Sequence, residues 1–489
     1  MTSFLIDDAR GLSLPGAAPS LWAALSARAA APGGGGALLG GPRGARWTAA
    51  DLASAAEQRA QALVAAGVEP GARICVQATG LAFWIEVFAI WRAAGVAALV
   101  HPAVPPDAAA AWAARVGARP APPAGAAIAD LPPAPQADAP AVLLRTSGST
   151  GPPKAALHSH RALAWCAAGM VQTLGLRPED RLLAALPFSF HYGFCQLSAA
   201  LLCGGAVVLE DSPLPAARAA LISSGSVSVA ALIPDLWAQV LAPPAGPGPR
   251  LALSAGGALP AAVRAGIGAA WPRVALHELY GATECLRSLH LRPDAEAGAG
   301  RVGQAVPGVA VAVIVEEQGQ QRIAAAGEEG ELVHAGAMLA LELPGEGGAA
   351  AIRPCPPLGA SRALFTGDRA VRDAEGRLWL RGRRDLQWKV GGLRVGPDEV
   401  EAALRALPGV RDALAFAVDD ADLGLHIEAA VRLGPDAPPL VQLQRAARAT
   451  LPPWSAPRVL HAWPGPWLCT DHGKPDRRAM AQACARRDR

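Results

Sequence analysis

The sequence predicts an α/β protein with a large N-terminal domain of parallel α/β sheets and a small C-terminal domain. Its 489 residues exceed one ordinary compact domain, so at least two domains are expected. Residues 47–103 alternate between helical and strand-like apolar spacing, which is typical of a mostly parallel sheet covered by helices. Short strands separated by glycine and acidic turns over 309–343 indicate a β-rich subdomain.

Local signals support each element at the start of the large domain. A helix is expected over 51–68, with Asp51 as its N-cap, and a second helix over 81–95. Short apolar strands are expected over 74–77 and 96–100, before and after the second helix. This strand–helix–strand order is the unit from which parallel sheets are built.

The later parts of the chain continue this pattern and then change it. Residues 102–140 are rich in Ala and Pro and are expected to form surface loops around one helix. Strand–loop–helix alternation then resumes to about residue 290. Past Asp385, a helix over 398–406 precedes apolar strands near 412–418 and 425–433, which predicts a compact α+β domain.

Composition and charge narrow the possible functions. Hydrophobic residues make up 52% of the chain, and the net charge of +3 is small, so a globular protein without a nucleic-acid surface is expected. The eight cysteines form no C-x-x-C pair and are expected to be reduced and mostly buried. The longest apolar run, 196–210, is too short for a membrane span, and the N-terminus does not resemble a signal peptide. These features predict a cytoplasmic protein.

A loop rich in glycine and hydroxyl side chains follows an apolar strand predicted over 141–144. It reads Thr146-Ser147-Gly148-Ser149-Thr150-Gly151-Pro152-Pro153-Lys154. Glycines let backbone N–H groups approach an anion closely, while hydroxyls and a lysine add donors and positive charge. The loop is not a P-loop, because its lysine follows Pro-Pro and no Ser or Thr succeeds it. Phosphate binding is the favoured interpretation, and a flexible Ser/Gly linker is the alternative.

This loop resembles the phosphate-binding signature of the adenylate-forming superfamily, which comprises acyl-CoA synthetases, carrier-protein adenylation domains and firefly-type luciferases. Six further segments resemble motifs of that superfamily, in the same order along the chain. They are Leu186-Pro187-Phe188-Ser189-Phe190-His191-Tyr192-Gly193, Ser254-Ala255-Gly256-Gly257-Ala258-Leu259-Pro260, Tyr280-Gly281-Ala282-Thr283-Glu284, Phe365-Thr366-Gly367-Asp368, the stretch from Gly382-Arg383-Arg384-Asp385 to Lys389-Val390-Gly391-Gly392-Leu393-Arg394-Val395, and Gly473-Lys474-Pro475-Asp476-Arg477-Arg478. Their shared order identifies the chain as a member of the superfamily.

The resemblance implies a reaction with two halves. A carboxylate attacks the α-phosphorus of ATP and expels pyrophosphate, and a thiol then displaces AMP from the acyl-adenylate. Mg²⁺ is the implied metal, with Glu284 as its ligand. The residues implied to bind the nucleotide are Thr146, Ser147, Gly148, Ser149, Thr150, Gly151 and Lys154 at the β- and γ-phosphates, Thr283 at the α-phosphate, Tyr280, Gly256 and Gly257 at the adenine with Ala258 and Gly281 beside them, and Asp368, expected at a strand end, with Arg383 at the ribose.

The resemblance assigns the adenylation step to Lys474, whose flexible ammonium would reach both the carboxylate and the α-phosphate oxygens. Asp385 matches the hinge on which the small domain turns between the poses of the two half-reactions. The expected domains are therefore 1–384, which binds ATP and the acid, and 385–489, which is mobile and carries Lys474. The other residues implied to be catalytic are Glu284, Thr283 and His191.

The segment after the hinge departs from the family pattern at two positions. Leu386 stands where a second acid is usual, and Trp388 stands where Ile is usual. Gly391 and Gly392 offer a backbone without side chains that would line a pantetheine channel. A plain strand turn is the alternative interpretation of these two glycines.

The acyl pocket is implied to involve His191, Tyr192, Gly193, Gly256 and Ala282. His191 among aromatic residues has a core position as its alternative interpretation. In amino-acid-activating relatives an Asp that pairs with the substrate ammonium is typical at the position of Tyr192. An acid without an α-amino group, aliphatic or aromatic and otherwise uncharged, therefore fits better. Cys285 is expected to be pocket wall rather than a nucleophile, because nothing near it in sequence would activate it.

The leading functional hypothesis is a ligase that joins a carboxylic acid to the thiol of CoA, using ATP and Mg²⁺. The alternative is a stand-alone adenylation enzyme that loads the acid onto the phosphopantetheine of a carrier protein, because both acceptors present the same thiol arm. A luciferase-like oxygenase is a more distant possibility. A non-catalytic adenylate-binding scaffold is disfavoured, because Lys474, Glu284 and Asp368 are all present.

Overall fold

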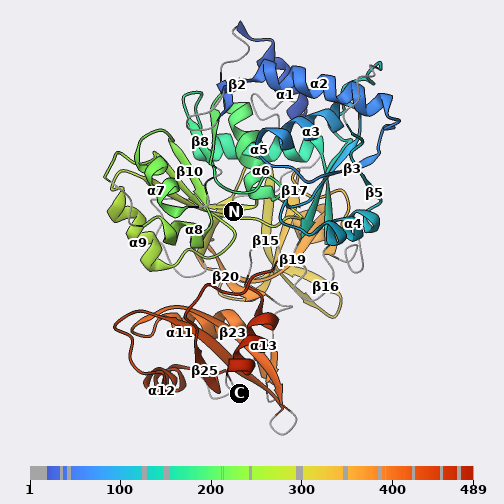
Figure 1. Cartoon of the computed structure of the whole chain (residues 1–489). Coiled ribbons are helices and arrows are strands. Elements are labelled where there is room, and N and C mark those ends of the chain that lie inside the picture. The colour runs from blue at the N-terminus through green and yellow to red at the C-terminus, as the bar shows by residue number, and fades with distance from the viewer. Residues whose placement is uncertain are drawn as a thin grey trace.

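The computed structural model describes residues 19–32, 37–40, 46–123, 129–146, 154–210, 212, 214–241, 245–292, 301–344, 351–383, 388–390, 393–420, 424–451, 455–470 and 475–487. Figure 1 shows a large lobe, which contains two extensive sheets and most of the helices, above a small lobe built from the C-terminal elements. The predicted α/β class is confirmed.

The larger sheet is parallel over one half. From one edge inward its strands are β2 (Arg46–Thr48), β1 (Ala37–Gly40), β9 (Ala206–Leu209), β8 (Arg181–Ala184), β10 (Val229–Leu232), β11 (Leu251–Ser254) and β12 (Ala275–Tyr280). All neighbours in this series pair in parallel except β1 and β2. Helices connect successive strands of this parallel half, as the alternation in the sequence predicted.

The other half of the same sheet is antiparallel. It continues from β12 through β13 (Leu289–Leu291), β14 (Arg301–Ala305), β20 (Leu378–Arg383), β19 (Ala360–Arg372), β17 (Glu329–Gly336), β15 (Val309–Glu317) and β16 (Gln320–Ile323), with β18 (Ile352–Cys355) paired to β19. This half contains the β-rich stretch that the sequence predicted over 309–343. It extends further, to Arg383, because later strands complete the sheet.

The smaller sheet has five strands, in the order β5 (Ala118–Pro120), β3 (Arg73–Val76), β4 (Val96–Leu99), β6 (Pro140–Thr146) and β7 (Lys154–Ser159). Its strands pair in parallel except β6 and β7, which form an antiparallel pair. The predicted strands over 74–77, 96–100 and 141–144 are present. The stretch 102–140, expected to be loops around one helix, also contributes the short strand β5.

A layer of helices lies between the two sheets and forms the main core. Its members are α1 (Leu21–Ala29), α2 (Ala49–Ala65), α3 (Gly80–Arg92), α5 (His160–Leu174) and α6 (His191–Cys203). Their buried side chains pack against Ile74 and Ala141 of the smaller sheet and against Leu182 and Leu253 of the larger one. The outer faces are covered by α7 (Pro215–Ser223), α8 (Pro234–Gln239) and α9 (Ala261–Ala270) on the larger sheet, and by α4 (Pro106–Arg115) on the smaller.

The start of α2 corrects one detail of the sequence analysis. Asp51 was expected to be the N-cap, but the cap is Thr48, whose Oγ1 accepts from the backbone N of Asp51 at 3.1 Å. Asp51 in turn accepts from the backbone N of Thr48 at 2.9 Å. The two residues form a capping box, in which the acid occupies the third helical position instead of the cap.

The small lobe has its own sheet and its own core. Its elements are β21 (Trp388–Val390), β22 (Leu393–Val395), α11 (Pro397–Arg405), β23 (Val410–Asp420), β24 (Gly424–Leu433), α12 (Leu440–Thr450), β25 (Val459–Ala462) and α13 (Arg477–Arg487). Strand β24 lies between β23 and β25, and α11 and α12 pack on this sheet around Val400, Leu404 and Leu443. The predicted helix and two strands of this region are present. The predicted boundary at 384/385 lies outside the described residues.

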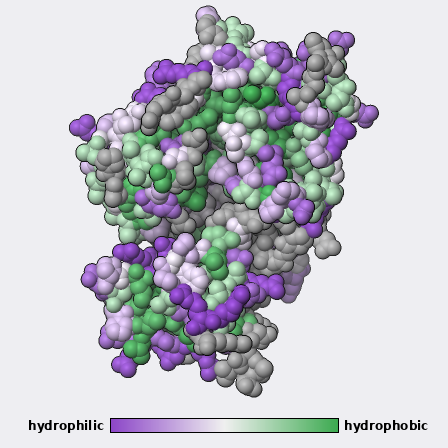
Figure 2. Space-filling view, in the orientation of Figure 1, coloured by the Kyte–Doolittle hydropathy of each residue, from purple (hydrophilic) through white to green (hydrophobic). Residues whose placement is uncertain are grey.

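The visible face of the molecule carries both hydrophilic and hydrophobic side chains. Figure 2 shows hydrophilic side chains distributed over both lobes of the visible face, with hydrophobic ones between them. Within the described segments, no helix is long and apolar enough to cross a membrane. All eight cysteines are free thiols, and five of them are buried.

Candidate nucleotide and acid site

The motifs collect at one edge of the parallel half-sheet. Strands β11 and β12 are parallel neighbours, with Ser254 opposite Glu278. Residues 255–258 directly follow β11, and residues 281–284 directly follow β12. The carboxyl ends of parallel strands lie at a common edge, which is where open α/β sheets bind their ligands. Residues 185–190 leave β8 at that edge and lead into α6.

The clearest contact in this region joins Tyr280 and Asp368. The Tyr280 hydroxyl donates a hydrogen bond to Oδ2 of Asp368. Burial raises the pKa of Tyr280 well above its usual value, and the neighbouring Asp368 carboxylate raises it further. The phenol therefore remains a proton donor that orients the carboxylate. In strand register Asp368 lies opposite Arg383, so three residues implied to contact the nucleotide meet here.

The position of Asp368 differs from the expectation of a strand end. It lies inside β19, a strand of 13 residues, at an irregularity in the pairing with β20. Its backbone N donates to Oγ1 of Thr366 at 3.1 Å, and that hydroxyl donates to the Leu332 carbonyl at 2.7 Å. A bulge of this kind redirects a side chain without ending the strand. The carboxylate is thereby directed toward Tyr280.

The base of the predicted phosphate loop is joined to the Thr283-Glu284 segment. Thr146 and Lys154, which flank the loop in sequence, lie opposite each other across β6 and β7. Four residues on from Lys154, Nε2 of the buried His158 donates to the Thr283 carbonyl at 2.7 Å. The Glu284 carbonyl accepts from the backbone N of Ala340 at 2.9 Å. The motifs are therefore fixed relative to each other by contacts to backbone atoms.

Two glycines of the motifs are required by close approach. A Cβ at Gly281 would overlap the carbonyl oxygen of Leu286, which folds back over the turn after β12. A Cβ at Gly193 would overlap the carbonyl oxygen of Pro187, against which the first turn of α6 packs. Any larger residue would displace backbone, so both glycines serve the local geometry.

The expected acyl side of the site is formed by the start of α6 and the turn after β12. His191 is the first residue of α6 and is half-buried, whereas Tyr192 is buried. The guanidinium carbon of Arg287 lies 5.1 Å from the centroid of the Tyr192 ring. Ala282 is half-buried in the turn, and Gly256 is exposed at the end of β11.

Cys285 fits the expectation of a wall residue. Its thiol is completely buried and lies 3.2 Å from Oγ of Ser288. Burial raises the pKa of Cys285 to about 12. The thiol is therefore protonated at neutral pH, which makes it a poor nucleophile.

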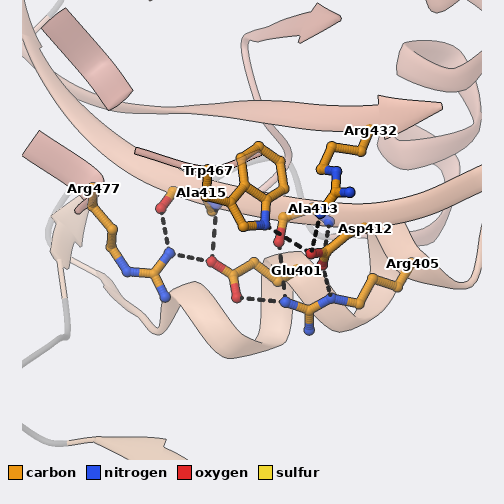
Figure 3. A network of polar contacts seen from close by, with 8 residues as sticks. All are labelled: Glu401, Arg405, Asp412, Ala413, Ala415, Arg432, Trp467 and Arg477. Atoms are coloured by element: carbon orange, nitrogen blue, oxygen red, sulfur yellow. Dashed lines mark hydrogen bonds and ion pairs between the residues drawn. The ribbon is translucent and has the colours of Figure 1, made fainter. Parts of the chain in front are cut away.

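The residues that follow Lys474 are held by a polar network in the small lobe, shown in Figure 3. Arg477 donates to Oε1 of Glu401 and, at 2.7 Å, to the Ala415 carbonyl. Glu401 also accepts from Arg405 at 3.0 Å and from the backbone N of Ala415 at 3.0 Å. Nearby, Asp412 accepts from Arg405 at 2.9 Å and from the Trp467 indole at 2.7 Å.

Several residues of the predicted site lie outside the described residues. They are Ser147, Gly148, Ser149, Thr150 and Gly151 of the loop, the hinge residue Asp385, the channel residues Gly391 and Gly392, and Lys474. Their roles stay predictions. On either side of the last of these segments, Cys469 and Pro475 form a β-bridge, so the chain on both sides of Lys474 is joined.

Comparison with known proteins agrees with this geometry. Residues 118–342, which include the loop and the Tyr280–Glu284 motif, match the AMP-binding enzyme family. Over this stretch, a little under half of the chain, the sequence belongs to the AMP-binding enzyme family. The resemblance drawn from the motifs is therefore confirmed.

Curated relatives include two kinds of protein. The nonribosomal peptide synthetase ivoA of Emericella nidulans is 33% identical over 54% of this chain and 15% of its own length. The sulfoacetate–CoA ligase of Cupriavidus necator is 30% identical over 62% of this chain and 59% of its own length. The chain thus spans less than two thirds of the length of either relative.

Among solved structures, ATP-bound MatB from Rhodopseudomonas palustris aligns with a TM-score of 0.82 at 24% identity. The alignment covers 95% of this chain and 98% of that one. At this identity the likeness concerns the fold alone.

Two site residues were not found by the sequence analysis. Arg287 lies three positions after Glu284, and His158 lies four positions after Lys154. Neither residue lies within one of the motifs identified in the sequence, so the sequence gives no signal for either. Only the fold brings Arg287 to Tyr192 and His158 to Thr283.

Proposed function

We propose that the chain uses ATP to join a carboxylic acid to a thiol. The acid, an aryl or fatty acid without an α-amino group, is activated as an acyl-adenylate with release of pyrophosphate, and the acyl group is transferred to CoA. One observation carries the proposal. The Tyr280 hydroxyl donates a hydrogen bond to Asp368, and Asp368 pairs with Arg383 in strand register. Thr283 and Glu284 follow Tyr280 in the turn after β12. This arrangement supports a nucleotide with its ribose at Asp368 and its phosphates toward Thr283.

Mg²⁺ fits the chemistry of this region. Glu284 supplies a half-buried carboxylate, and among the described residues no group of three or more His, Cys, Asp or Glu side chains could hold a metal. Mg²⁺ is commonly held by one or two carboxylates together with phosphate oxygens, so a single protein carboxylate is sufficient. When bound, the ion neutralises negative charge on the phosphates. Glu284 would hold it beside the loop at Thr146–Lys154.

The composition of the chain supports a specific role for lysine. Of the 44 basic residues only three are lysines, namely Lys154, Lys389 and Lys474, and each lies in one of the motifs. Arginine serves at every other basic position, although the two residues differ in reach, flexibility and hydrogen-bond geometry. Lysine is retained where a flexible point charge is needed. This supports Lys474 as the residue that stabilises charge during adenylation, with Thr283 and His191 bordering the reacting groups.

The adenylation proposal is tested by removing that charge. Lys474→Ala is expected to slow acid-dependent pyrophosphate exchange by roughly 100- to 1000-fold, the scale of losing one charge-stabilising donor. Transfer to the thiol from supplied acyl-adenylate should be largely preserved. Arg478→Ala, in the same basic segment, is the matched control and should leave exchange unchanged. Near-normal exchange in Lys474→Ala would contradict the assignment.

The second candidate differs only in the thiol acceptor. The relative ivoA is a nonribosomal peptide synthetase, which favours a carrier protein's phosphopantetheine, whereas the sulfoacetate–CoA ligase favours CoA. Release of AMP should be measured with CoA and with a phosphopantetheinylated carrier protein at equal thiol concentration. Turnover with CoA alone supports the first proposal, and turnover with the carrier alone supports the second. Strong exchange with an α-amino acid would overturn the substrate class.

A further inference from the structure

Three buried polar side chains lie beside the expected acyl pocket. Arg287 is 1% exposed, Gln196 is 2% exposed and Tyr192 is 6% exposed. Within the described part of the chain, no hydrogen-bond partner is present for Nε and Nη2 of Arg287, for either amide atom of Gln196, or for the Tyr192 hydroxyl. Unpaired polar groups are unfavourable in a protein interior, and a lone guanidinium is the most unfavourable of them. The arrangement requires a partner that the described residues do not supply.

These groups face one another across two elements. Tyr192 and Gln196 lie one turn apart on α6, so they share a face of that helix. Arg287 comes from the turn after β12, with its guanidinium carbon 5.1 Å from the Tyr192 ring centroid. The residue before it, Leu286, has a φ of 53°, a left-handed conformation that is uncommon for a side chain of this size. Such strain is typical of functional positions, and here it belongs to the turn that places Arg287.

The neighbours of Arg287 do not include a carboxylate within the described ranges. The titratable groups near it are the Tyr192 phenol and the thiols of Cys166 and Cys195, whose sulfur atoms lie 3.4 Å apart. Burial raises the pKa of Tyr192, so the phenol is neutral. A hydrogen bond to Cys195 raises the pKa of Cys166, and the same bond lowers the pKa of Cys195. If Cys195 is ionised, it competes with a ligand for the guanidinium within the described ranges.

We propose that Arg287 binds a second anionic group on the acid substrate, so that the chain activates dicarboxylic acids in preference to monocarboxylic ones. Nε and Nη2 form one edge of the guanidinium, and this edge matches the two oxygens of a carboxylate. The Tyr192 hydroxyl and the Gln196 amide provide further donors on the adjoining helix face. This inference rests on the proposed function and narrows its substrate class.

The proposal also revises the expectation of an otherwise uncharged acid. The absence of an acid at Tyr192 disfavours an α-ammonium group, and the positive charge of Arg287 disfavours it further. The same charge attracts an anionic group on the substrate. A substrate whose far end is purely apolar cannot pair with the buried guanidinium. A site built to pair a polar group rejects the analogue that lacks it more strongly than an apolar pocket rejects an extra group.

Matched pairs of acids test this preference. Succinate is compared with 4-methylpentanoate, glutarate with 5-methylhexanoate, and terephthalate with 4-isopropylbenzoate. In each pair an isopropyl group replaces one carboxylate with similar shape and no charge. In pyrophosphate exchange, at least one diacid is expected to exceed its partner by roughly 100-fold in kcat/KM.

Variants of the chain assign the preference to Arg287. Arg287→Gln should lower kcat/KM for the diacid and raise it for the isopropyl acid, while KM for ATP stays unchanged. Arg218→Gln is the matched control, because Arg218 is also buried, at 8% exposed, and lies on α7 away from this cluster. It should keep the diacid preference. If Arg287→Gln does not fold, Tyr192→Phe and Arg287→Lys should each reduce the preference without reversing it.

Other results would overturn the inference. Equal exchange with both members of every pair in the unmodified chain is the result expected if a Cys195 thiolate balances Arg287. A raised KM for ATP in Arg287→Gln, with the diacid preference intact, would place the anion on the nucleotide. If none of the acids supports pyrophosphate exchange, that result would instead contradict the proposed function, so the two failures are distinguishable.

Discussion

At the scale of single residues, three histidines occupy positions that disfavour their charged form. His158, His160 and His334 are at most 1% exposed. Burial lowers the pKa to about 4 for His158 and His160 and to about 3 for His334. His158 keeps a hydrogen bond to Thr283, but neither ring nitrogen of His160 has a partner in the described part of the chain. His160 therefore contributes packing, edge-on against Trp91 at 5.1 Å between centroids.

The lowered pKa of His160 predicts the sign of a pH effect. Between pH 6.5 and about 4, the unfolded chain binds a proton at this position and the folded chain does not. The contribution of the neutral, buried His160 to folding stability is therefore fully present above pH 6.5, and it is lost as the pH falls toward 4. His160→Phe keeps a ring against Trp91 and removes the titration. Its stability relative to the unmodified chain should increase by about 2 kcal/mol from pH 7 to pH 5, as urea unfolding would show. An equal difference at both pH values would contradict this.

At the scale of elements, α13 begins immediately after the segment that carries Lys474. The start of the helix is fixed by Asp476, whose Oδ1 accepts from the backbone N of Ala479 at 3.0 Å and whose own N donates to the Leu468 carbonyl at 2.7 Å. Arg477 then ties α13 to α11 through Glu401, whose side chain is 4% exposed. Arg477 is thus a positioning residue for the lysine segment.

Loosening this tie should affect one half-reaction more than the other. Arg477→Met is expected to lower stability by about 2 kcal/mol, because charged hydrogen bonds to Glu401 and Ala415 are lost. Adenylation should fall by about 10-fold, since a small misplacement of a catalytic group has a large effect on rate. Thiol transfer from supplied acyl-adenylate should change less. The measurements are Tm and the two half-reactions, with Arg478→Met as the control. Equal losses in both halves would indicate a purely structural role.

Elements with a strong local pattern were predictable from the sequence. The apolar spacing of α2, α3 and α11 gave their type and approximate limits, and glycine and acidic turns indicated the antiparallel half-sheet. Strand β5 was not predicted, because three residues ending in proline show no alternation. The motif order placed Tyr280 and Asp368 in one site, but their direct hydrogen bond depends on pairing across the sheet. Arg287 acquires meaning only when the fold sets it against α6.

At the scale of the whole molecule, the two lobes meet closely at the end of β20. Gly382 has a φ of 100°, and a Cβ there would lie 2.6 Å from Oδ2 of Asp398 on α11. Strand β20 ends at Arg383, and the next described strand, β21, begins at Trp388 and packs against the core of the small lobe. Rotation of the small lobe would separate Gly382 from Asp398. Asp385, as the proposed hinge, would absorb the change in backbone angles.

Stiffening the hinge should separate the two half-reactions in the opposite direction from Lys474→Ala. Asp385→Pro fixes φ near −65° and restricts the preceding residue, so one of the two poses is lost. We expect pyrophosphate exchange to persist and thiol transfer to stop. Asp385→Ala, which keeps a flexible backbone, should retain both activities. Survival of both half-reactions in Asp385→Pro would contradict a rotation about this residue.

Residues 340–342 are joined to the loop strand β7 and to Glu284 by backbone atoms. Leu157 donates to the Glu342 carbonyl at 2.9 Å, Leu341 donates to the Leu157 carbonyl at 2.7 Å, and Ala340 donates to that of Glu284. Such bonds are indifferent to side-chain identity. Substitutions at residues such as Tyr192, Gln196 and Arg287 can therefore change which acid is bound. The backbone geometry of the nucleotide-binding region stays the same. For protein engineering, side chains of the acid pocket can therefore be substituted, while the backbone hydrogen bonds hold the nucleotide-binding region in place.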